Sequence, residues 1–493
     1  MKILFLNPLR TNNSFHINHD LIISYISTPS LTFAQLASYI GDHEMTIIDG
    51  QVENIYLDDF LEKLKTVDVV VISISSSYEA DRCETNIKII KKYYPKIRII
   101  MGGYHASYFY EGWLNIGVDF VLLFEAERYF KELIECLDKG ADYRKISSLV
   151  YKVDGKVIVN GLGPLIGDLD LVPIPRFDLI DFKNYFAFFP GDGYAGGIEL
   201  SRGCRYRCKF CLTCRYWNYY YRRKSNQRII KELQLLVGMD VRKIWFYTAS
   251  FGIMPEEDYA LCELIENNGL KINWRVPIRV DTVLNHPELI KKASGAGLKS
   301  VLIGYESFLK DTVDKDTISL LNPTEKSLYD FYNFKKAYRI LKENNILTEG
   351  SFIIGYSDEV ENNDSLSLEK FNQVCDFLII QVSRPNVALF PEVLDKGPNN
   401  CEYKRLFNFN VYNSDVVKVR KALSKKIRIQ IKYFFNPAYI YLRLFLRGSL
   451  VRRLYLYFYG HILKNLFRKF TSGVVNCNNT KFSNLTRSVK DVS

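Results

Sequence analysis

The chain has 493 residues, of which 47% are apolar and 25% charged, with ten cysteines and a formal net charge of +11. These values are ordinary for globular proteins and exclude a largely disordered or fibrous chain. Ten cysteines are too few for a secreted scaffold held by disulfides, and the first apolar run is too short for a signal peptide. We therefore expect a cytoplasmic protein of about three domains.

Residues 1–141 alternate short apolar runs with segments of helical periodicity, which is typical of a parallel sheet covered by helices. The predicted strands are residues 2–7, 45–49, 67–73, 97–101 and 118–124, and the predicted helices are residues 31–40, 57–64, 80–93 and 126–137. This order predicts a Rossmann-like or flavodoxin-like domain. Such sheets bind their ligands at the carboxyl ends of the strands.

Residues 142–190 are expected to connect two domains. Alternating apolar residues flank Asp154 and Gly155, which indicates a β-hairpin. Pro173 and Pro175 then favour an extended path, as expected of a linker.

Residues 191–400 are predicted to form a full or partial (β/α) barrel, because strand and helix patterns alternate there a second time. The expected strands are residues 196–200, 243–247, 273–277, 300–304 and 348–355, and the expected helices are residues 225–237, 255–267, 287–293 and 324–344. In such barrels the chemistry gathers at the carboxyl ends of the strands.

Residues 401–493 are predicted to be a basic helical extension with a frayed end. Residues 416–470 hold 14 Lys and Arg and no acidic residue, so the rest of the chain has 52 basic against 55 acidic residues. The longest stretches there without Lys or Arg have ten residues, which is too short to span a membrane. Aromatic helical faces packed on the barrel are the favoured reading. The alternatives are an anionic membrane surface, with a peripheral location, and nucleic acid, which is the least favoured partner.

The densest chemical signal is a cysteine cluster directly after a predicted strand. Cys204, Cys208 and Cys211 are separated by three and then two residues, so three thiols can converge from one loop. Three thiolates can hold a 4Fe–4S cluster and leave one iron open for another ligand. The neighbouring cations, Arg202, Arg205, Arg207 and Lys209, are expected to lower the pKa of the thiols.

A four-cysteine zinc site is the competing interpretation, because Cys214 follows three residues after Cys211. Two features argue against zinc. Structural zinc sites usually combine two separated pairs of ligands, whereas these four thiols fall within eleven residues. The loop also follows a strand at the start of a large β/α domain, where a catalytic centre is expected.

The spacing of Cys204, Cys208 and Cys211, with the aromatic Phe210 before the last, resembles the cluster motif of the radical S-adenosylmethionine (SAM) superfamily. Residues 274–281, 296–298 and 303–307 resemble the third and fourth barrel strands of a subgroup that has an amino-terminal cobalamin-binding domain. The pattern Gly102-Gly103-x-His105 and the segment 124–127 fall where that domain has Gly-Gly-x-His and Gly-Glu-Gly-Glu motifs. The resemblance covers roughly residues 1–360.

The resemblance implies that Cys204, Cys208 and Cys211 ligate a 4Fe–4S cluster, whose open iron binds SAM and whose electron produces a 5′-deoxyadenosyl radical. It assigns to the SAM pocket Phe210, Gly304, Glu306 and Gly355. Glu306, at a strand end, could accept hydrogen bonds from ribose or ammonium groups. The two glycines would let a flat ligand approach the backbone.

The resemblance also implies cobalamin, with the site assigned to Ser75, Ser76, Gly102, Gly103 and His105. The chain has no Asp-x-His-x-x-Gly loop, which would supply a histidine below the cobalt. A sheet domain that is only structural, or that binds another ligand, is the alternative.

Three departures from the family pattern weaken the case for cobalamin more than the case for SAM. The segment 246–251 lacks the paired aspartates that often follow the second barrel strand. Phe124 and Ala126 stand where the Gly-Glu-Gly-Glu motif has glycines, and residues 356–359 replace a Pro-Glu-Thr-like turn.

The expected activity, implied by the resemblance, is cobalamin-dependent methyl transfer to an unactivated carbon or phosphorus centre of a small molecule or peptide. An external electron donor of the flavodoxin or ferredoxin type would reduce the cluster. Two alternatives stay open. One is a radical rearrangement or cyclisation without methylation, and the other is a non-catalytic iron–sulfur or zinc binding protein.

Overall fold

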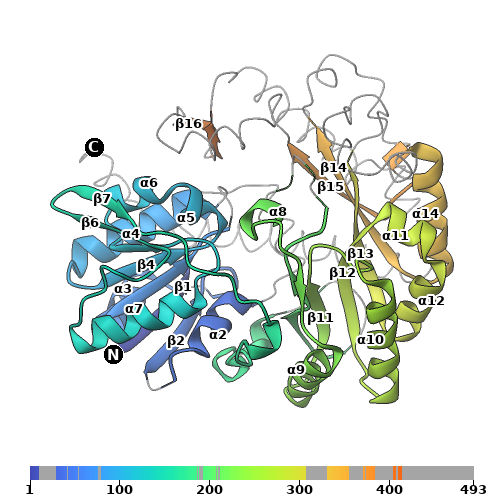
Figure 1. Cartoon of the computed structure of the whole chain (residues 1–493), viewed down its shortest axis with the longest axis horizontal. Helices are drawn as coiled ribbons and strands as arrows, with labels where there is room; N and C mark the ends of the chain where they lie inside the picture. Colours follow the sequence, from blue (N-terminus) through green and yellow to red (C-terminus); the bar gives the residue numbers. More distant parts are fainter. Residues whose placement is uncertain are drawn as a thin grey trace, which may run out of the picture.

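Two α/β units lie side by side in the computed structural model, and the short helix α8 (Thr213–Tyr216) lies between them (Figure 1). The structure describes residues 1–9, 29–41, 43–53, 55–75, 79–185, 187, 192–206, 208, 211, 213–306, 330–354, 370–371, 373–382, 403–406 and 409–412. Both units carry the parallel sheets and covering helices predicted for them, so the predicted fold class is confirmed.

The first unit is a sheet with the strand order β2-β1-β3-β4-β5-β6-β7, of which the first five strands are parallel. Its parallel strands are β1 (Lys2–Asn7), β2 (Glu44–Asp49), β3 (Val69–Ser73), β4 (Arg98–Gly102) and β5 (Phe120–Leu122). Its helices are α2 (Leu31–Ala37), α3 (Leu57–Leu64), α4 (Ala80–Tyr93), α5 (Tyr104–Tyr108), α6 (Tyr110–Asn115) and α7 (Glu127–Lys139).

Helices cover both faces of this sheet, which is why its strands read as continuous apolar runs. Leu4, Leu6, Val70 and Ile72 pack in one core with α3, α4 and α6. Their strand neighbours Ile3, Phe5, Val69 and Val71 pack in a second core with α2 and α7. The alternation along each strand therefore fills two cores, one on each side of the sheet.

The predicted hairpin belongs to the first sheet rather than to the connector. Strand β6 (Leu149–Val153) pairs antiparallel with β5, and β7 (Lys156–Val159) pairs antiparallel with β6. Asp154 and Gly155 at the turn have φ values of 49° and 77°. Positive φ at both central residues is typical of the tight hairpin turn that an Asp-Gly pair predicts.

The connector that follows is attached to both units. It contains three short 3-10 helices, η2 (Leu169–Leu171), η3 (Phe177–Leu179) and η4 (Phe182–Asn184). Gln35 of α2 donates to the Pro173 carbonyl oxygen over 2.9 Å. Arg228 of the second unit donates to the carbonyl oxygens of Asp170 and Val172 over 3.0 and 2.7 Å. The connector is therefore a packed joint between the two units.

The second unit is an open, partial barrel of six parallel strands in the order β8-β11-β12-β13-β14-β15. The strands are β8 (Tyr194–Glu199), β11 (Val241–Tyr247), β12 (Asn273–Arg279), β13 (Leu298–Glu306), β14 (Leu347–Ile354) and β15 (Phe377–Val382). The helices are α9 (Asn226–Gly238), α10 (Pro255–Asn267), α11 (Val280–Asn285), α12 (Pro287–Gly295) and α14 (Phe331–Glu343). The first five strands were predicted, and β15 was not.

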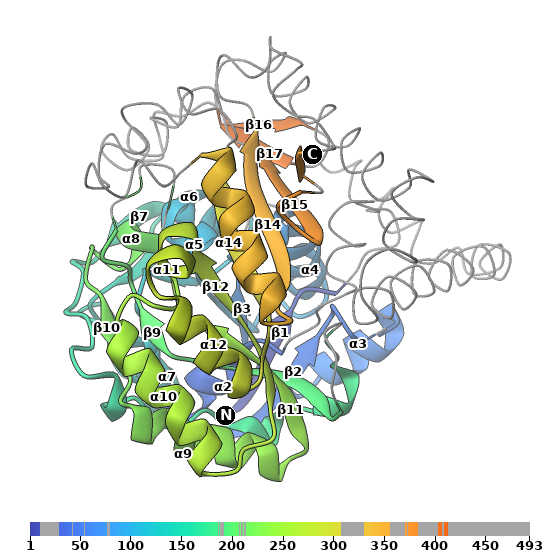
Figure 2. The same ribbon diagram turned by 90° about the vertical axis from the view of Figure 1, so that its right-hand side faces the viewer.

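One face of this second sheet is closed by helices, with α10, α12 and α14 in front of it in Figure 2. Alternate strand residues pack into this helical layer, namely Ile244, Phe246, Val276, Ile278, Val301 and Ile303. The intervening side chains of β12 and β13 point to the opposite face, and the last of them are Arg279 and Glu306.

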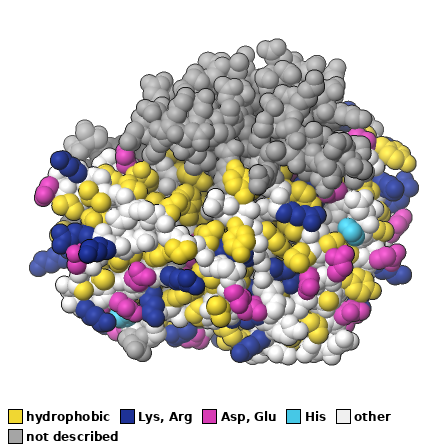
Figure 3. Space-filling view, in the orientation of Figure 1, with side chains coloured by type: hydrophobic (Ala, Val, Ile, Leu, Met, Phe, Trp, Pro, Cys, Tyr) yellow, Lys and Arg dark blue, Asp and Glu magenta, His cyan; other side chains and the backbone are white. Residues whose placement is uncertain are grey.

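In the extension, the described residues form a hairpin of β16 (Tyr403–Leu406) and β17 (Phe409–Tyr412) rather than a helix. Aromatic and β-branched residues such as Tyr403, Phe409 and Val411 favour strands. The basic segment 416–470 lies outside the described residues. No helix in the described part of the chain is long and apolar enough to cross a membrane. Acidic and basic side chains are interspersed over both units on the face shown in Figure 3.

Candidate functional site

The cysteine loop leaves the second sheet directly after β8 and returns through a narrow neck. Strand β9 (Ser201–Arg202) pairs antiparallel with β10 (Arg222–Arg223), with Arg202 opposite Arg222. Gly203 has a φ of 79°, and a Cβ there would lie 2.1 Å from the Tyr220 carbonyl oxygen. Because no other residue fits this close approach, a glycine is required before Cys204.

The three predicted cluster ligands, Cys204, Cys208 and Cys211, are free thiols of intermediate burial on this loop. Cys214 differs from them, since it is buried and its thiol donates to the Cys211 carbonyl oxygen over 3.3 Å. Among the described residues, no three His, Cys, Asp or Glu side chains come close enough together to hold one metal ion. Each thiol of a 4Fe–4S cluster binds a different iron, so a cluster does not require the three thiols to surround one ion.

Burial raises the pKa of Cys204 to about 11 and that of Cys208 to about 12. The prediction that the cations of the loop lower these pKa values is therefore wrong for these two thiols. Arg202 binds carboxylates instead, and the cation that partly opposes the rise is Arg279 of β12. A bound metal would supply the positive charge that a thiolate needs here.

Glu306 is the last residue of β13, and it is near enough to the cysteine loop for its charge to act on Cys208. Its negative charge contributes to the raised pKa of Cys208, and Arg279 acts on both groups. Burial raises the pKa of Glu306 itself to about 7, against the opposing charge of Arg279. Its φ of 65° is a strained conformation for a residue other than glycine, and such strain is typical of functional sites.

Gly304 makes room for Glu306, because a Cβ at Gly304 would lie 2.5 Å from the Glu306 Oε1 atom. The sequence suggested that this glycine admits a flat ligand, whereas here the neighbouring carboxylate occupies that space. The other two residues assigned to the SAM pocket, Phe210 and Gly355, lie outside the described residues.

Arg279 and Tyr206 are site residues that the sequence reasoning missed. The guanidinium group of Arg279 lies 3.7 Å from the Tyr206 ring centroid and pairs with Asp281 over 2.8 Å. A sequence pattern could have identified Arg279, because a cation and an acid, Arg279 and Asp281, follow a predicted strand at its carboxyl end. The predicted strand stopped at residue 277, two residues short of Arg279.

On the first unit, Ser75, Gly102 and Gly103 lie at the adjacent carboxyl ends of β3 and β4, and Ser75 is exposed. Gly103 has a φ of 98°, and a Cβ there would lie 2.5 Å from the Ile74 carbonyl oxygen, whereas a Cβ at Gly102 would make only an ordinary contact, 3.7 Å from the Leu122 carbonyl oxygen. Half-buried glycine backbone and an exposed hydroxyl group could receive the long tail of a cobalamin. Ser76, the remaining serine assigned to this site, lies outside the described residues.

His105 is buried beneath this edge, with 6% of its surface exposed. The Trp113 indole donates to its Nδ1 atom over 3.2 Å, and its Nε2 atom has no hydrogen-bond partner in the described part of the chain. Burial lowers the pKa of His105 to about 4, so the ring is neutral. These contacts give His105 a packing role between α5 and α6.

The segment 124–127 explains one departure from the family motif. Phe124, which stands where the motif has its first glycine, has a φ of 58°. Its amide donates to the Ser107 hydroxyl over 2.9 Å, and its carbonyl accepts from the Tyr216 hydroxyl over 2.7 Å. Ala126, in place of the second glycine, has an ordinary φ of −119°. Phe124 therefore has the left-handed conformation that glycine adopts readily, whereas position 126 does not need a glycine.

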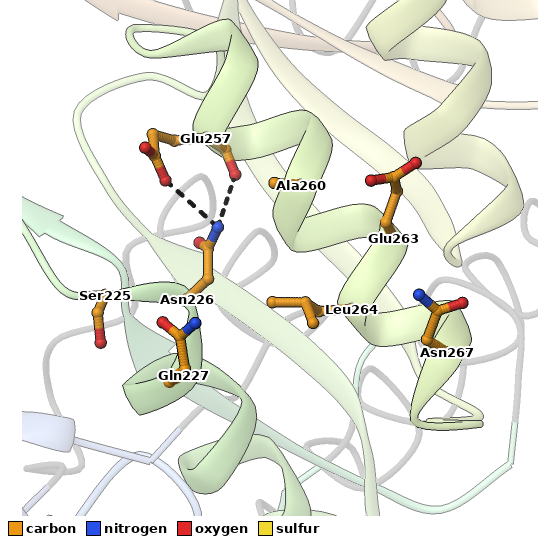
Figure 4. A pocket seen from close by; sticks show the side chains of 8 residues that line it. All are labelled: Ser225, Asn226, Gln227, Glu257, Ala260, Glu263, Leu264 and Asn267. Atoms are coloured by element: carbon orange, nitrogen blue, oxygen red, sulfur yellow. Dashed lines mark hydrogen bonds between the residues drawn. The ribbon is translucent and has the colours of Figure 1, made fainter.

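Two pockets lie elsewhere on the molecule. One of about 410 Å³ opens between α9 and α10 on the outer side of the second unit, where Asn226 donates to the Glu257 carbonyl oxygen over 3.0 Å (Figure 4). The other, of about 980 Å³, is lined by residues at the amino-terminal ends of β3 and β4, such as Asp68 and Arg98. Neither pocket includes the cysteine loop, Arg279 or Glu306.

Two family models match the chain. Residues 25–134 match the B12 binding domain, and residues 198–364 match the Radical SAM superfamily. An uncharacterized methyltransferase of Pyrococcus horikoshii is 30% identical over 340 residues, which are 67% of this chain and 70% of that protein. The anaerobic magnesium-protoporphyrin IX monomethyl ester cyclase of Rubrivivax gelatinosus is 24% identical, over 89% of this chain and 78% of its own.

Among solved structures, the cobalamin-dependent S-adenosylmethionine radical enzyme OxsB, with aqua-cobalamin and S-adenosylmethionine bound, has the same fold. The two structures superpose with a TM-score of 0.64, and their sequences are 17% identical. The match covers 93% of this chain and 70% of the OxsB chain. The predicted family is confirmed, and its cofactors are a 4Fe–4S cluster, SAM and cobalamin. The chain belongs to the radical SAM superfamily, in the branch that carries an amino-terminal B12-binding domain.

Proposed function

We propose that this protein is a radical SAM methyltransferase that uses cobalamin to methylate an unactivated carbon or phosphorus centre of a small molecule or peptide. The position of the cysteine loop supports this proposal most directly. Tyr206 on this loop lies against Arg279 of the second sheet, whose guanidinium group is 3.7 Å from the Tyr206 ring centroid, while the Tyr216 hydroxyl of the same loop donates to the Phe124 carbonyl oxygen at the carboxyl end of the first sheet over 2.7 Å. One loop thus faces both cofactor domains of the family.

On the second unit, Cys204, Cys208 and Cys211 would ligate the cluster. When bound, the cluster supplies the electron that cleaves SAM, and cobalamin carries the methyl group. Glu306 would accept hydrogen bonds from the SAM amino or ribose groups. Arg279, stacked on Tyr206, balances the charge of that carboxylate. Phe210 and Gly355 complete the proposed SAM pocket.

On the first unit, we assign the cobalamin tail to the strand ends that carry Ser75, Ser76, Gly102 and Gly103. The exposed Ser75 and the close approach of the backbone at Gly103 support this assignment. His105 would support this edge from below rather than contact the ligand, because its Nδ1 atom accepts a hydrogen bond from Trp113 and its ring is buried.

Two further partners belong to the proposal. An external one-electron donor of the flavodoxin or ferredoxin type would reduce the cluster, since each turnover consumes an electron. The basic segment 416–470 would contact either the barrel or an anionic membrane surface, and its charge pattern supports both.

The experiment is an anaerobic reconstitution of the full chain with iron, sulfide and hydroxocobalamin, followed by dithionite and SAM. The expected result is an iron–sulfur absorbance, one bound corrinoid per chain and the formation of 5′-deoxyadenosine. Cluster-loaded protein that forms no 5′-deoxyadenosine would contradict the radical chemistry.

The same reaction separates methylation from the alternatives. S-adenosylhomocysteine is left when SAM gives its methyl group away, so its formation supports the methyltransferase. Formation of 5′-deoxyadenosine without S-adenosylhomocysteine would indicate a rearrangement or cyclisation instead. One equivalent of zinc with no iron absorbance would indicate a binding protein.

A further inference from the structure

A buried carboxylate of the first unit binds the neck of the cysteine loop in the second unit. Glu125 follows β5 and has 6% of its surface exposed. It accepts hydrogen bonds from Arg202 of β9 and, over 2.8 and 3.0 Å, from the Nη1 atom of Arg222 in β10. The Ile166 amide of the connector also donates to it over 3.1 Å. Three separate segments therefore meet on one carboxylate.

The two arginines occupy the positions that close the loop. Arg202 and Arg222 are directly opposite each other in the β9–β10 pair, and Gly203 and Cys204 follow Arg202 at once. A carboxylate that binds both arginines therefore fixes both strands of the neck. Any shift of Glu125 would move the point from which the cysteine loop starts.

Arg202 is bound by carboxylates from both units. Besides Glu125, it pairs with Glu127 of the first unit over 2.7 Å and with Glu199, the last residue of β8, over 2.9 Å. The Arg202 side chain is 3% exposed, so these pairs are screened much less than pairs on the surface. Charged groups at such depth are costly when a partner is removed, because the remaining charge stays buried.

The returning half of the loop is docked on the first unit as well. The Tyr216 ring of α8 stacks on Tyr104 at a centroid distance of 3.9 Å, and its hydroxyl donates to the Phe124 carbonyl oxygen over 2.7 Å. The Trp217 ring centroid lies 5.3 Å from the guanidinium carbon of Arg202 and 5.4 Å from that of Arg222. The first unit thus binds the loop at its neck and at α8.

We infer that Glu125, Arg202 and Arg222 form a positioning hub that sets the cysteine loop against the carboxyl edge of the first sheet. The inference rests on the proposed function, since the two cofactors then lie on the two sides that the hub joins. The hub residues are positioning residues, because the hydrogen bonds described for them join the neck of the loop to the first sheet and to the connector. Weakening the hub is expected to separate SAM cleavage from methyl transfer.

The test compares two single carboxylate changes in the full-length, reconstituted protein. Glu125→Gln keeps the volume of the side chain and removes its negative charge, while Glu127 still pairs with Arg202. Asp258→Asn is the matched control, because Asp258 pairs with Arg223, the next residue of β10, over 3.0 Å and is equally buried. Both Asp258 and Arg223 lie within the second unit.

The first measurement is hydrogen exchange by mass spectrometry, which does not depend on activity. Glu125→Gln is expected to raise exchange about tenfold in peptides covering residues 120–127 and 201–206, as the loss of a charged hydrogen bond implies. Asp258→Asn is expected to raise exchange in α10 and to leave residues 120–127 unchanged. If residues 120–127 and 201–206 exchange at the same rate in Glu125→Gln as in wild type, the proposal of a positioning hub is wrong.

The second measurement is single-turnover chemistry with dithionite and SAM. Glu125→Gln is expected to bind iron and corrinoid as wild type does and to form 5′-deoxyadenosine at a similar rate. It is expected to form S-adenosylhomocysteine about tenfold more slowly, since a hydrogen bond to a charged group is worth about that factor. If both products decrease equally, or if neither decreases, Glu125 has only a structural role and the proposal is wrong.

A milder variant covers the case in which Glu125→Gln does not fold. Tyr216→Phe removes only the hydroxyl that binds Phe124, and it is expected to give a smaller change of the same kind in exchange and in product ratio. If wild type forms no 5′-deoxyadenosine, the proposed function fails, while the exchange measurement still decides whether the hub joins the units.

Discussion

The carboxyl edges of the two sheets flank the same cysteine loop, and they offer different chemistry. The edge of the first sheet presents glycine backbone and the Ser75 hydroxyl, with its histidine buried below. The edge of the second sheet presents charged side chains, Arg279 and Glu306, beside the thiols. The first edge therefore suits a large ligand that is held by shape, and the second edge suits a small charged ligand that is held by side chains.

The largest expected effect is at the thiols of the second edge. Cys208→Ala is expected to lower cluster iron and reduce 5′-deoxyadenosine to background, because three thiolates are needed to hold a cluster with one open iron. Cys214→Ala is the matched control, since Cys214 is buried and bound to the backbone of the loop. Loss of iron in Cys214→Ala as in Cys208→Ala would instead favour a four-cysteine site.

The charged ligand of the second edge is tested at Glu306. Glu306→Gln is expected to weaken SAM binding about 10- to 100-fold, the factor for losing hydrogen bonds to a charged acceptor. Equilibrium dialysis of SAM on cluster-loaded protein measures this effect. The exposed Glu288→Gln serves as control and is expected to bind as wild type. Unchanged SAM binding in Glu306→Gln would remove this residue from the pocket.

The first edge is tested by two neighbouring glycines. Gly103→Ala is expected to destabilise the protein by about 1–3 kcal/mol and to lower corrinoid content, because its φ of 98° and the approach of Ile74 leave no room for a Cβ. Gly102→Ala should unfold like wild type, since the nearest atom to its added Cβ lies at 3.7 Å. Thermal unfolding and the corrinoid spectrum measure both. Equal behaviour of the two variants would contradict this account of the edge.

His105 gives an effect that depends on pH. Its folded pKa of about 4 is below the unfolded value of 6.5, so the unfolded chain binds more protons between these values. Stability is therefore lost as the pH falls from 6.5 towards 4, by roughly 3 kcal/mol at most. Denaturant unfolding of wild type and His105→Gln should show a steeper pH dependence in wild type. Equal slopes, with loss of corrinoid in the variant, would instead make His105 a ligand residue.

The last expected effect concerns the basic segment 416–470. Replacing Lys425, Lys426 and Arg428 by Glu is expected to weaken flotation with vesicles of anionic lipid by about 1 kcal/mol per charge if the segment binds membranes. Equal flotation of wild type and variant would remove the membrane alternative and leave packing on the barrel.

The sequence predicted the regular elements well, because helical and strand periodicities are local. It missed β15 (Phe377–Val382), a short run of apolar residues without alternation, which periodicity alone does not assign. It also placed the hairpin in the connector. A hairpin signal identifies two strands, but it does not say that their next partner is β5.

The site was predicted in part, for similar reasons. Cysteine spacing is local, and it identified the loop at once. The contacts of Arg202 with Glu125 join residues 77 positions apart, and those of Arg222 join residues 97 apart, so no local pattern encodes them. Counting cations near the cysteines along the chain gave the wrong direction for two thiol pKa values, because burial dominates them.

The central claim is that one loop serves both SAM cleavage and cobalamin-dependent methylation. The most direct measurement is an anaerobic single turnover of the holoprotein with dithionite and methyl-deuterated SAM, in which 5′-deoxyadenosine, S-adenosylhomocysteine and deuterium on the corrinoid are quantified together. The account predicts all three products in wild type and none of them in Cys208→Ala. Formation of 5′-deoxyadenosine with neither S-adenosylhomocysteine nor labelled corrinoid would contradict it.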